Sequence, residues 1–141
     1  MNYYIKKGIV LIILLFGMLQ LQAQDTTLNF TLESDVVNIA GYDTALKSTI
    51  IKSDGNIILT QYSSDAKNET KFNIINSSGD WNQDTSIGSI IYSMAIDDFQ
   101  CNLTLLGQES GISVILNLRT PNLQYDEYKF IIRDITYNKK P

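Results

Sequence analysis

The sequence predicts a mainly β protein, either a small antiparallel β-sandwich or a partly open up-and-down barrel, that follows an N-terminal signal peptide. From Asp25 onward, apolar and polar residues alternate with a period of two, which is typical of strands with one face on a core. Clusters of Asp, Asn, Gly and Ser separate the alternating runs, as expected for the turns of an antiparallel sheet. An α+β fold, in which an antiparallel sheet carries one short helix, is the alternative.

Residues 1–23 have the three parts of a secretory signal peptide. Two lysines supply the positive start, an apolar run covers 9–19, and the small residue Ala23 closes the segment. The apolar run is shorter than the ~20 residues that a transmembrane helix needs. We therefore expect a single β-rich domain over 24–141 that is exported, to the periplasm first and the extracellular space second, with no stable membrane anchor after cleavage.

The alternation predicts nine strands in order along the chain. They are expected near 27–33, 36–40, 47–52, 56–62, 70–76, 88–96, 99–106, 112–119 and 125–137. In the seventh run, for example, the apolar Phe99 and Cys101 alternate with polar residues. The apolar face of the last run switches sides, and a β-bulge near Arg133-Asp134 accounts for that switch.

Turn-forming residues fall between these strands. They lie at 53–56, 77–80, 97–98, 107–111 and 120–122. Asp54-Gly55 suits the positive φ of a tight hairpin. The one candidate helix begins at Asp43 or Thr44, which could cap a short turn. For residues 47–52 a strand is preferred to a helix, because they include a β-branched run that leads into the Asp-Gly turn.

The charge of the mature chain argues against nucleic acid as a partner. Without the two lysines of the signal peptide, 9 of the 11 Lys and Arg residues remain against 15 Asp and Glu, a net charge of −6. Such a chain repels phosphates rather than neutralising them. The expected partners are an unknown protein or a small apolar ligand.

The absence of histidine excludes several reaction mechanisms. The chain contains 0 His and 1 Cys, so Ser-His-Asp and Cys-His catalysis and histidine-based metal sites are ruled out. The single cysteine, Cys101, cannot form an internal disulfide, and its place on an apolar face predicts a small buried side chain. We expect no enzyme. A hydrolase built on the carboxylate pairs Asp97-Asp98 or Asp126-Glu127 is the least favoured reading.

Two groups of residues are candidate sites. Asp80, Asn82 and Asp84 place oxygen ligands at positions one, three and five of a loop, which is typical of calcium sites, although Gly at position six and Glu at position twelve are missing. We expect no cofactor, with calcium as the one candidate. A second group of aromatic residues could form a binding surface on the sheet. It consists of Tyr125, Tyr128, Tyr137 and Trp81, whereas Phe130 of the same run is expected to pack in the core.

The end of the presequence, Leu21-Gln22-Ala23-Gln24, resembles exported proteins of Bacteroidota. Thr26 and Thr44 follow Asp in triplets similar to the O-glycosylation sites of such proteins. The segment "ISVILNLRTPNLQYDEYKFIIRDITYNK" resembles, more faintly, an uncharacterised family of exported Bacteroidota domains with a TBP-like fold. That resemblance implies a helix upstream of these strands and no activity.

Together these observations predict an exported, non-enzymatic binding or interaction domain. A small carrier of an apolar ligand, with a barrel-like cavity, is the alternative function.

Overall fold

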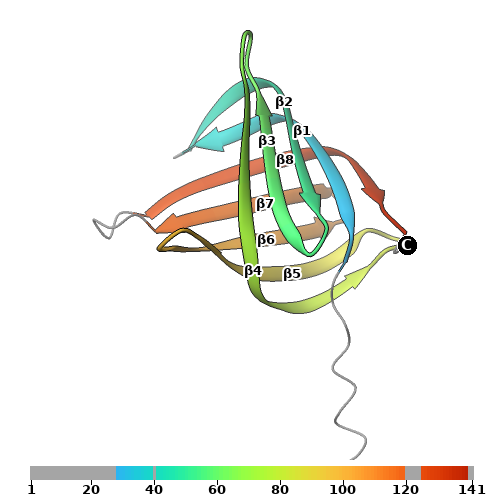
Figure 1. Cartoon of the computed structure of the whole chain (residues 1–141). Coiled ribbons are helices and arrows are strands. Elements are labelled where there is room, and N and C mark those ends of the chain that lie inside the picture. The colour runs from blue at the N-terminus through green and yellow to red at the C-terminus, as the bar shows by residue number, and fades with distance from the viewer. Residues whose placement is uncertain (1–27, 40, 120–124, 140–141) are drawn as a thin grey trace, which may run out of the picture.

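Eight antiparallel strands form a closed up-and-down barrel (Figure 1). The computed structural model describes residues 28–39, 41–119 and 125–139, without the side chains of 42–47 and of Tyr125. The strands are β1 (Phe30–Ile39), β2 (Tyr42–Ser53), β3 (Asn56–Tyr62), β4 (Lys67–Asn82), β5 (Ile87–Ile96), β6 (Phe99–Gln108), β7 (Gly111–Arg119) and β8 (Tyr125–Tyr137). Each strand pairs with the next, and β8 closes the barrel on β1.

The predicted mainly β class is confirmed, and the architecture is the barrel rather than the sandwich. The barrel is closed, whereas the sequence indicated a partly open one. The helical alternative was wrong, because 43–50 belongs to β2, which pairs with β1 and β3. No helix among the described residues is long and apolar enough to cross a membrane. The predicted signal peptide lies outside the described residues.

The first two predicted strands are one strand, β1, with a bulge inside it. The register on β2 shifts between Ser34 and Val36. The buried Ser34 hydroxyl lies 2.8 Å from the carbonyl oxygen of Val36 and 2.6 Å from that of Ile131 in β8. This hydroxyl is therefore a hydrogen-bond donor for backbone carbonyls that the irregular pairing leaves without a strand partner. The strand continues through Ser34-Asp35, the polar pair that suggested a break between two strands.

The predicted turn at 77–80 is also wrong, since β4 continues through it to Asn82. Ser77, Ser78 and Gly79 pair in register with β5, and the chain turns later, over 83–86. The φ of Gly79 is +121°, a conformation that glycine adopts within a strand without strain. Residues 77–80, which favour turns, therefore lie within an irregular part of β4.

Other local predictions are confirmed. The register of β8 on β1 skips Arg133, which places a bulge where the apolar face changes sides. Asp54-Gly55 forms the β2–β3 turn, with Gly55 at φ +69°, and Asp97-Asp98 forms the β5–β6 turn.

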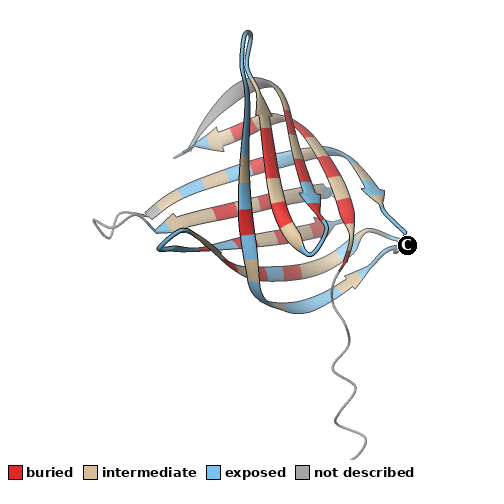
Figure 2. Cartoon of the chain, in the orientation of Figure 1, coloured by how far each residue is buried: buried red, intermediate tan, exposed pale blue. Residues whose placement is uncertain are grey.

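The buried residues lie along the strands of the barrel (Figure 2), and they form one hydrophobic core cluster. Phe30, Leu105 and Phe130 are fully buried, and the Phe30 and Tyr92 rings meet at 6.2 Å between centroids. Cys101 is buried as a free thiol, as predicted, and burial raises the pKa of that thiol. The core therefore rests on alternating strand residues rather than on cross-links.

Candidate functional site

A cavity of about 240 Å³ lies inside the barrel toward the end where β3 leads into β4, β5 into β6 and β7 into β8. It is lined by Leu59, Gln61, Thr70, Phe72, Ile96, Leu116, Leu118, Tyr128 and Phe130. These residues come from five strands, which only barrel closure brings together. An eight-stranded barrel has an interior of the size that side chains fill or that holds one small ligand.

The lining is apolar and aromatic with a few hydrogen-bonding groups. Gln61, Thr70 and Tyr128 carry the side-chain polar groups, and no lining residue is charged. Gln61 and Thr70 lie on paired strands, whereas Tyr128 comes from β8. Apolar walls with a few placed polar groups are typical of small-molecule pockets.

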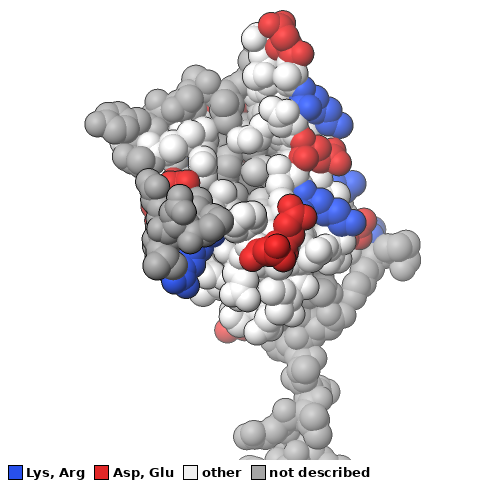
Figure 3. All heavy atoms as spheres, turned by 60° about the vertical axis from the view of Figure 1, so that its left-hand side comes forward, with Lys and Arg blue, Asp and Glu red and all other residues white. Residues whose placement is uncertain are grey.

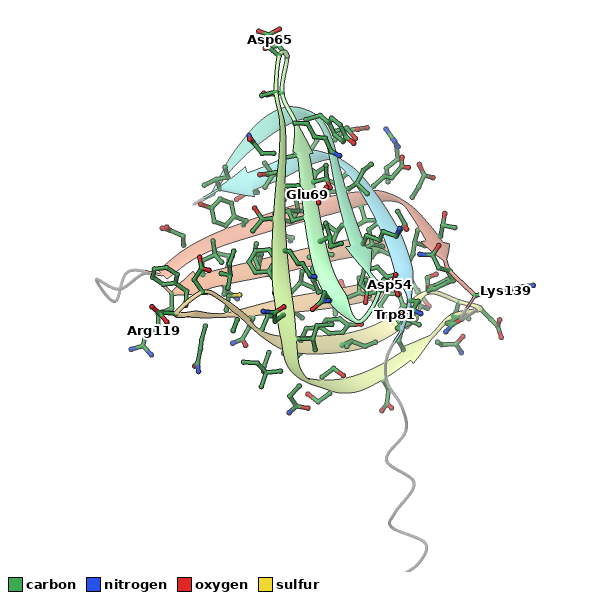
Figure 4. All side chains as sticks on the ribbon, in the orientation of Figure 1. Asp54, Asp65, Glu69, Trp81, Arg119 and Lys139 are labelled. Atoms are coloured by element: carbon green, nitrogen blue, oxygen red, sulfur yellow. The ribbon has the colours of Figure 1, made fainter. Side chains whose placement is uncertain are left out.

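The opposite end of the barrel is covered by Trp81. Its indole Nε1 donates a hydrogen bond of 2.8 Å to the Tyr137 hydroxyl, which also lies 2.8 Å from the Ser86 hydroxyl. The indole lies directly over Gly107, where an added Cβ would be 2.6 Å from the ring. Figure 4 shows Trp81 and Arg119 at opposite ends of the barrel. A ligand would therefore enter from the cavity end.

The Tyr92 hydroxyl is a buried polar group of the interior. Tyr92 is 1% exposed, and its hydroxyl finds no hydrogen-bond partner among the described residues. Burial raises the pKa of Tyr92 to about 12, and the nearby Ser53 hydroxyl lowers it in part without reaching hydrogen-bonding geometry. The interior thus favours the neutral phenol strongly.

Tyr92→Phe is expected to leave the protein at least as stable at neutral pH and to reduce its loss of stability in alkali. An unpaired buried hydroxyl costs ~1–3 kcal/mol, so its removal is neutral or stabilising. The folded-state pKa of Tyr92, about 12, exceeds the ordinary value of 10.0, so ionisation of Tyr92 does not affect the free energy of unfolding below pH 10. That free energy falls as the pH rises from 10 through 12, because the unfolded chain ionises more readily than the folded protein. The loss amounts to about 2–3 kcal/mol. Urea unfolding of both proteins at pH 9 and at pH 12 measures it.

The difference between the two proteins isolates Tyr92 from the other tyrosines and lysines, which titrate in both. Equal alkaline losses in the two proteins would contradict the buried, neutral phenol.

The structure brings only some of the predicted aromatic residues together. Trp81 and Tyr137 meet at the covered end, whereas Tyr128 lines the cavity at the other end. The Tyr125 side chain lies outside the described part of the chain. Phe130 is fully buried, as predicted.

The calcium candidates lie where β4 ends. The Asn82 side-chain oxygen accepts hydrogen bonds from the backbone N–H groups of Asp84, at 2.9 Å, and of Thr85, at 3.2 Å. Asp80 and Asp84 are exposed. Within the described residues, no group of three or more His, Cys, Asp or Glu could hold a metal ion. Asn82 therefore orders the turn, and calcium binding stays a prediction.

The remaining candidates are polar surface positions or lie outside the description. Asp97 and Asp98 form an exposed turn, and Asp126 and Glu127 are neighbours on β8. Of the two glycosylation candidates, Thr26 lies outside the described residues, and Thr44 lies in β2, opposite Val37 in register, with its side chain not described.

Of the cavity residues, the sequence singled out Tyr128 as a binding candidate and Phe130 as a core residue, but none of the others. Alternation indicates that Leu59, Leu116 and Leu118 face inward, but not which inward positions leave space between them. No model of a known protein family matches the chain. No curated protein matches it either. The geometry of the cavity therefore carries the functional argument.

Proposed function

We propose that the protein is an exported barrel that binds one small, uncharged, mostly apolar molecule in the cavity lined by Phe72, Leu116 and Tyr128. The observation that carries the proposal is a cavity of about 240 Å³ with no charged lining residue, in a barrel covered by Trp81 at its other end. A dry apolar cavity of ~150 Å³ is enough to bind benzene. The space therefore suits a molecule of one or two rings or a short branched chain.

The polar groups of the lining favour a ligand with a neutral hydrogen-bonding head. Gln61 both donates and accepts hydrogen bonds, and the hydroxyls of Thr70 and Tyr128 can do either. A charged head would lose its hydration without gaining a counter-charge from the described lining. An alcohol, ketone or amide on an apolar body fits these groups better.

The signal-peptide pattern at 1–23 supports a role outside the cytoplasm. The interaction domain that the sequence favoured first stays a prediction. Large exposed apolar residues such as Ile75, Ile91 and Ile131 lie on three different strands, and scattered residues of this kind occur on any surface.

Binding of 1-naphthol, a neutral two-ring alcohol with environment-sensitive fluorescence, tests the proposal. The purified mature protein is expected to bind the probe saturably and to melt at a higher temperature in its presence. Leu116→Trp fills the cavity and should abolish binding. Ile131→Trp adds the same side chain at a residue that is 51% exposed, so it should bind as the wild type does.

Circular dichroism shows whether each variant folds, and Leu118→Phe, a smaller change at the same cavity, serves if Leu116→Trp does not. The proposal fails if the wild type shows no saturable binding, or if the folded cavity-filling variant binds as well as the wild type.

A further inference from the structure

The first part of β4 extends beyond its neighbour β5. Pairing between β4 and β5 begins at Asn73, opposite Ala95, whereas pairing between β4 and β3 extends back to Lys67. Among the described strands, none lies beside the outer edge of β4 from Lys67 to Phe72. Figure 1 shows the β3–β4 hairpin standing clear of the barrel at this point. Every second residue of this segment thus directs its backbone N–H and C=O groups away from the sheet.

An open strand edge of this kind is a template for pairing with another strand. Proteins often protect such an edge with charge, and this one carries charges of alternating sign. Lys67, Glu69 and Lys71 are exposed on one face of β4, and Asp65 lies at the tip of the hairpin. Figure 3 shows acidic and basic side chains alternating downward from that tip. The charges therefore do not repel every incoming strand equally.

Antiparallel pairing of two copies places these charges opposite one another, and the register centred on Asn68 makes them complementary. With the two-fold axis at Asn68, each Lys67 lies opposite the Glu69 of a second copy. The hairpin turn of that copy, which carries Asp65, comes beside Lys71, so both strand pairs join opposite charges and the turn adds acidic charge near Lys71. In an antiparallel pair, residues that face each other share a face of the sheet, so these side chains can meet.

Neighbouring registers with the same two-fold symmetry are repulsive. Moving the axis by one residue toward the barrel places Glu69 opposite Glu69, and moving it by one toward the tip places Lys67 opposite Lys67. Like charges directly opposite each other destabilise a sheet. The charge pattern therefore favours the register centred on Asn68 over its two nearest neighbours, which a purely protective run of lysines would not do.

We propose that the protein forms a two-fold symmetric dimer by antiparallel pairing of this β4 edge with the same edge of a second copy. Such an interface is self-complementary and closes on itself, so it gives dimers rather than fibres. Within one chain Lys67 and Glu69 form an ion pair of 3.5 Å, but both are more than half exposed and can exchange it for the contact between copies.

The dimer is expected to be weak and to depend on salt. The interface is short, and its exposed ion pairs are screened at ~1 M salt, where the Debye length is ~3 Å. Analytical ultracentrifugation over a range of protein concentrations at low and at high salt should show a monomer–dimer equilibrium that shifts to the monomer in salt.

Charge reversal tests the register directly. Lys67→Glu places two like-charged pairs in the interface and should raise the dimer dissociation constant about tenfold or more. The double variant Lys67→Glu with Glu69→Lys keeps every pair opposite in sign, so its dissociation constant should return to near the wild-type value. Lys129→Glu makes the same charge change at an exposed residue of β8 and should have no effect.

A protein that stays monomeric up to its solubility limit at low salt would overturn the proposal, because the β4 edge would then not pair with a second copy. The proposal is equally overturned if Lys67→Glu dimerises as the wild type does, or if the double variant fails to restore the dimer. All exchanged residues are exposed, and circular dichroism verifies the fold of each variant. Naphthol binding by the monomer is a separate measurement, so the two proposals can fail independently.

Discussion

Gly79→Ala is expected to lower the free energy of unfolding by about 3–5 kcal/mol. The φ of Gly79 is +121°, and an added Cβ would lie 2.1 Å from the backbone carbonyl oxygen of Ser89 on β5. A backbone atom cannot move aside as the end of a flexible side chain can, so β4 and β5 would have to separate locally. Urea unfolding followed by circular dichroism measures the loss.

Gly111→Ala is the matched control. Its φ of +133° is similar, but nothing lies within 4 Å of an added Cβ. This variant should lose only the cost of the backbone conformation, about 1–2 kcal/mol. If the two variants lost equal stability, the close approach of β4 and β5 at Gly79 would not be what requires glycine there.

Gly79 also illustrates why the sequence predicted the strands better than their ends. Glycine and serine favour turns, and a Ser-Ser-Gly-Asp run reads as one. Only the partner strand reveals that the glycine is needed for close contact with β5. The Asp54-Gly55 turn was predictable because its chemistry is local. A tertiary contact overrides such local preferences without leaving a trace in the sequence.

The bulge in β8 could be predicted in position but not in its consequences. The switch of the apolar face marks the irregularity near Arg133. The Arg133 guanidinium contacts Asp134 at 2.9 Å, Glu33 at 2.7 Å, and Asp35, and these contacts, that with Asp134 first, raise its pKa further. The contacts to β1 depend on barrel closure, which joins residues about 100 positions apart.

The candidate site could be predicted only in kind. The sequence left open a barrel with an apolar interior as one alternative, because the alternation of apolar and polar residues indicates which positions face inward. Whether their side chains fill the interior depends on how eight tilted strands are staggered. Trp81 shows this dependence, since it covers one end of the barrel through Tyr137, 56 positions away along the chain. The aromatic residues that the sequence grouped together are therefore divided between the two ends.

Phe30→Ala is expected to cost about 3–5 kcal/mol, because it removes a fully buried ring and leaves a cavity. Phe30 lies at the start of β1 and pairs with both β2 and β8. Its ring contacts the ring of Tyr92 on β5. Its loss therefore weakens the place where the barrel closes. The free energy of unfolding from urea titration gives the measure.

Phe99→Ala makes the same truncation at a residue that is 40% exposed, at the start of β6, and should cost no more than about 1 kcal/mol. A small domain with a single buried cysteine has no disulfide to limit the entropy of its unfolded chain. Its stability must then come from the buried side chains of the core, and a loss of several kcal/mol is a large part of the total. Equal losses for the two phenylalanines would contradict the burial of the Phe30 ring where β1 pairs with β8.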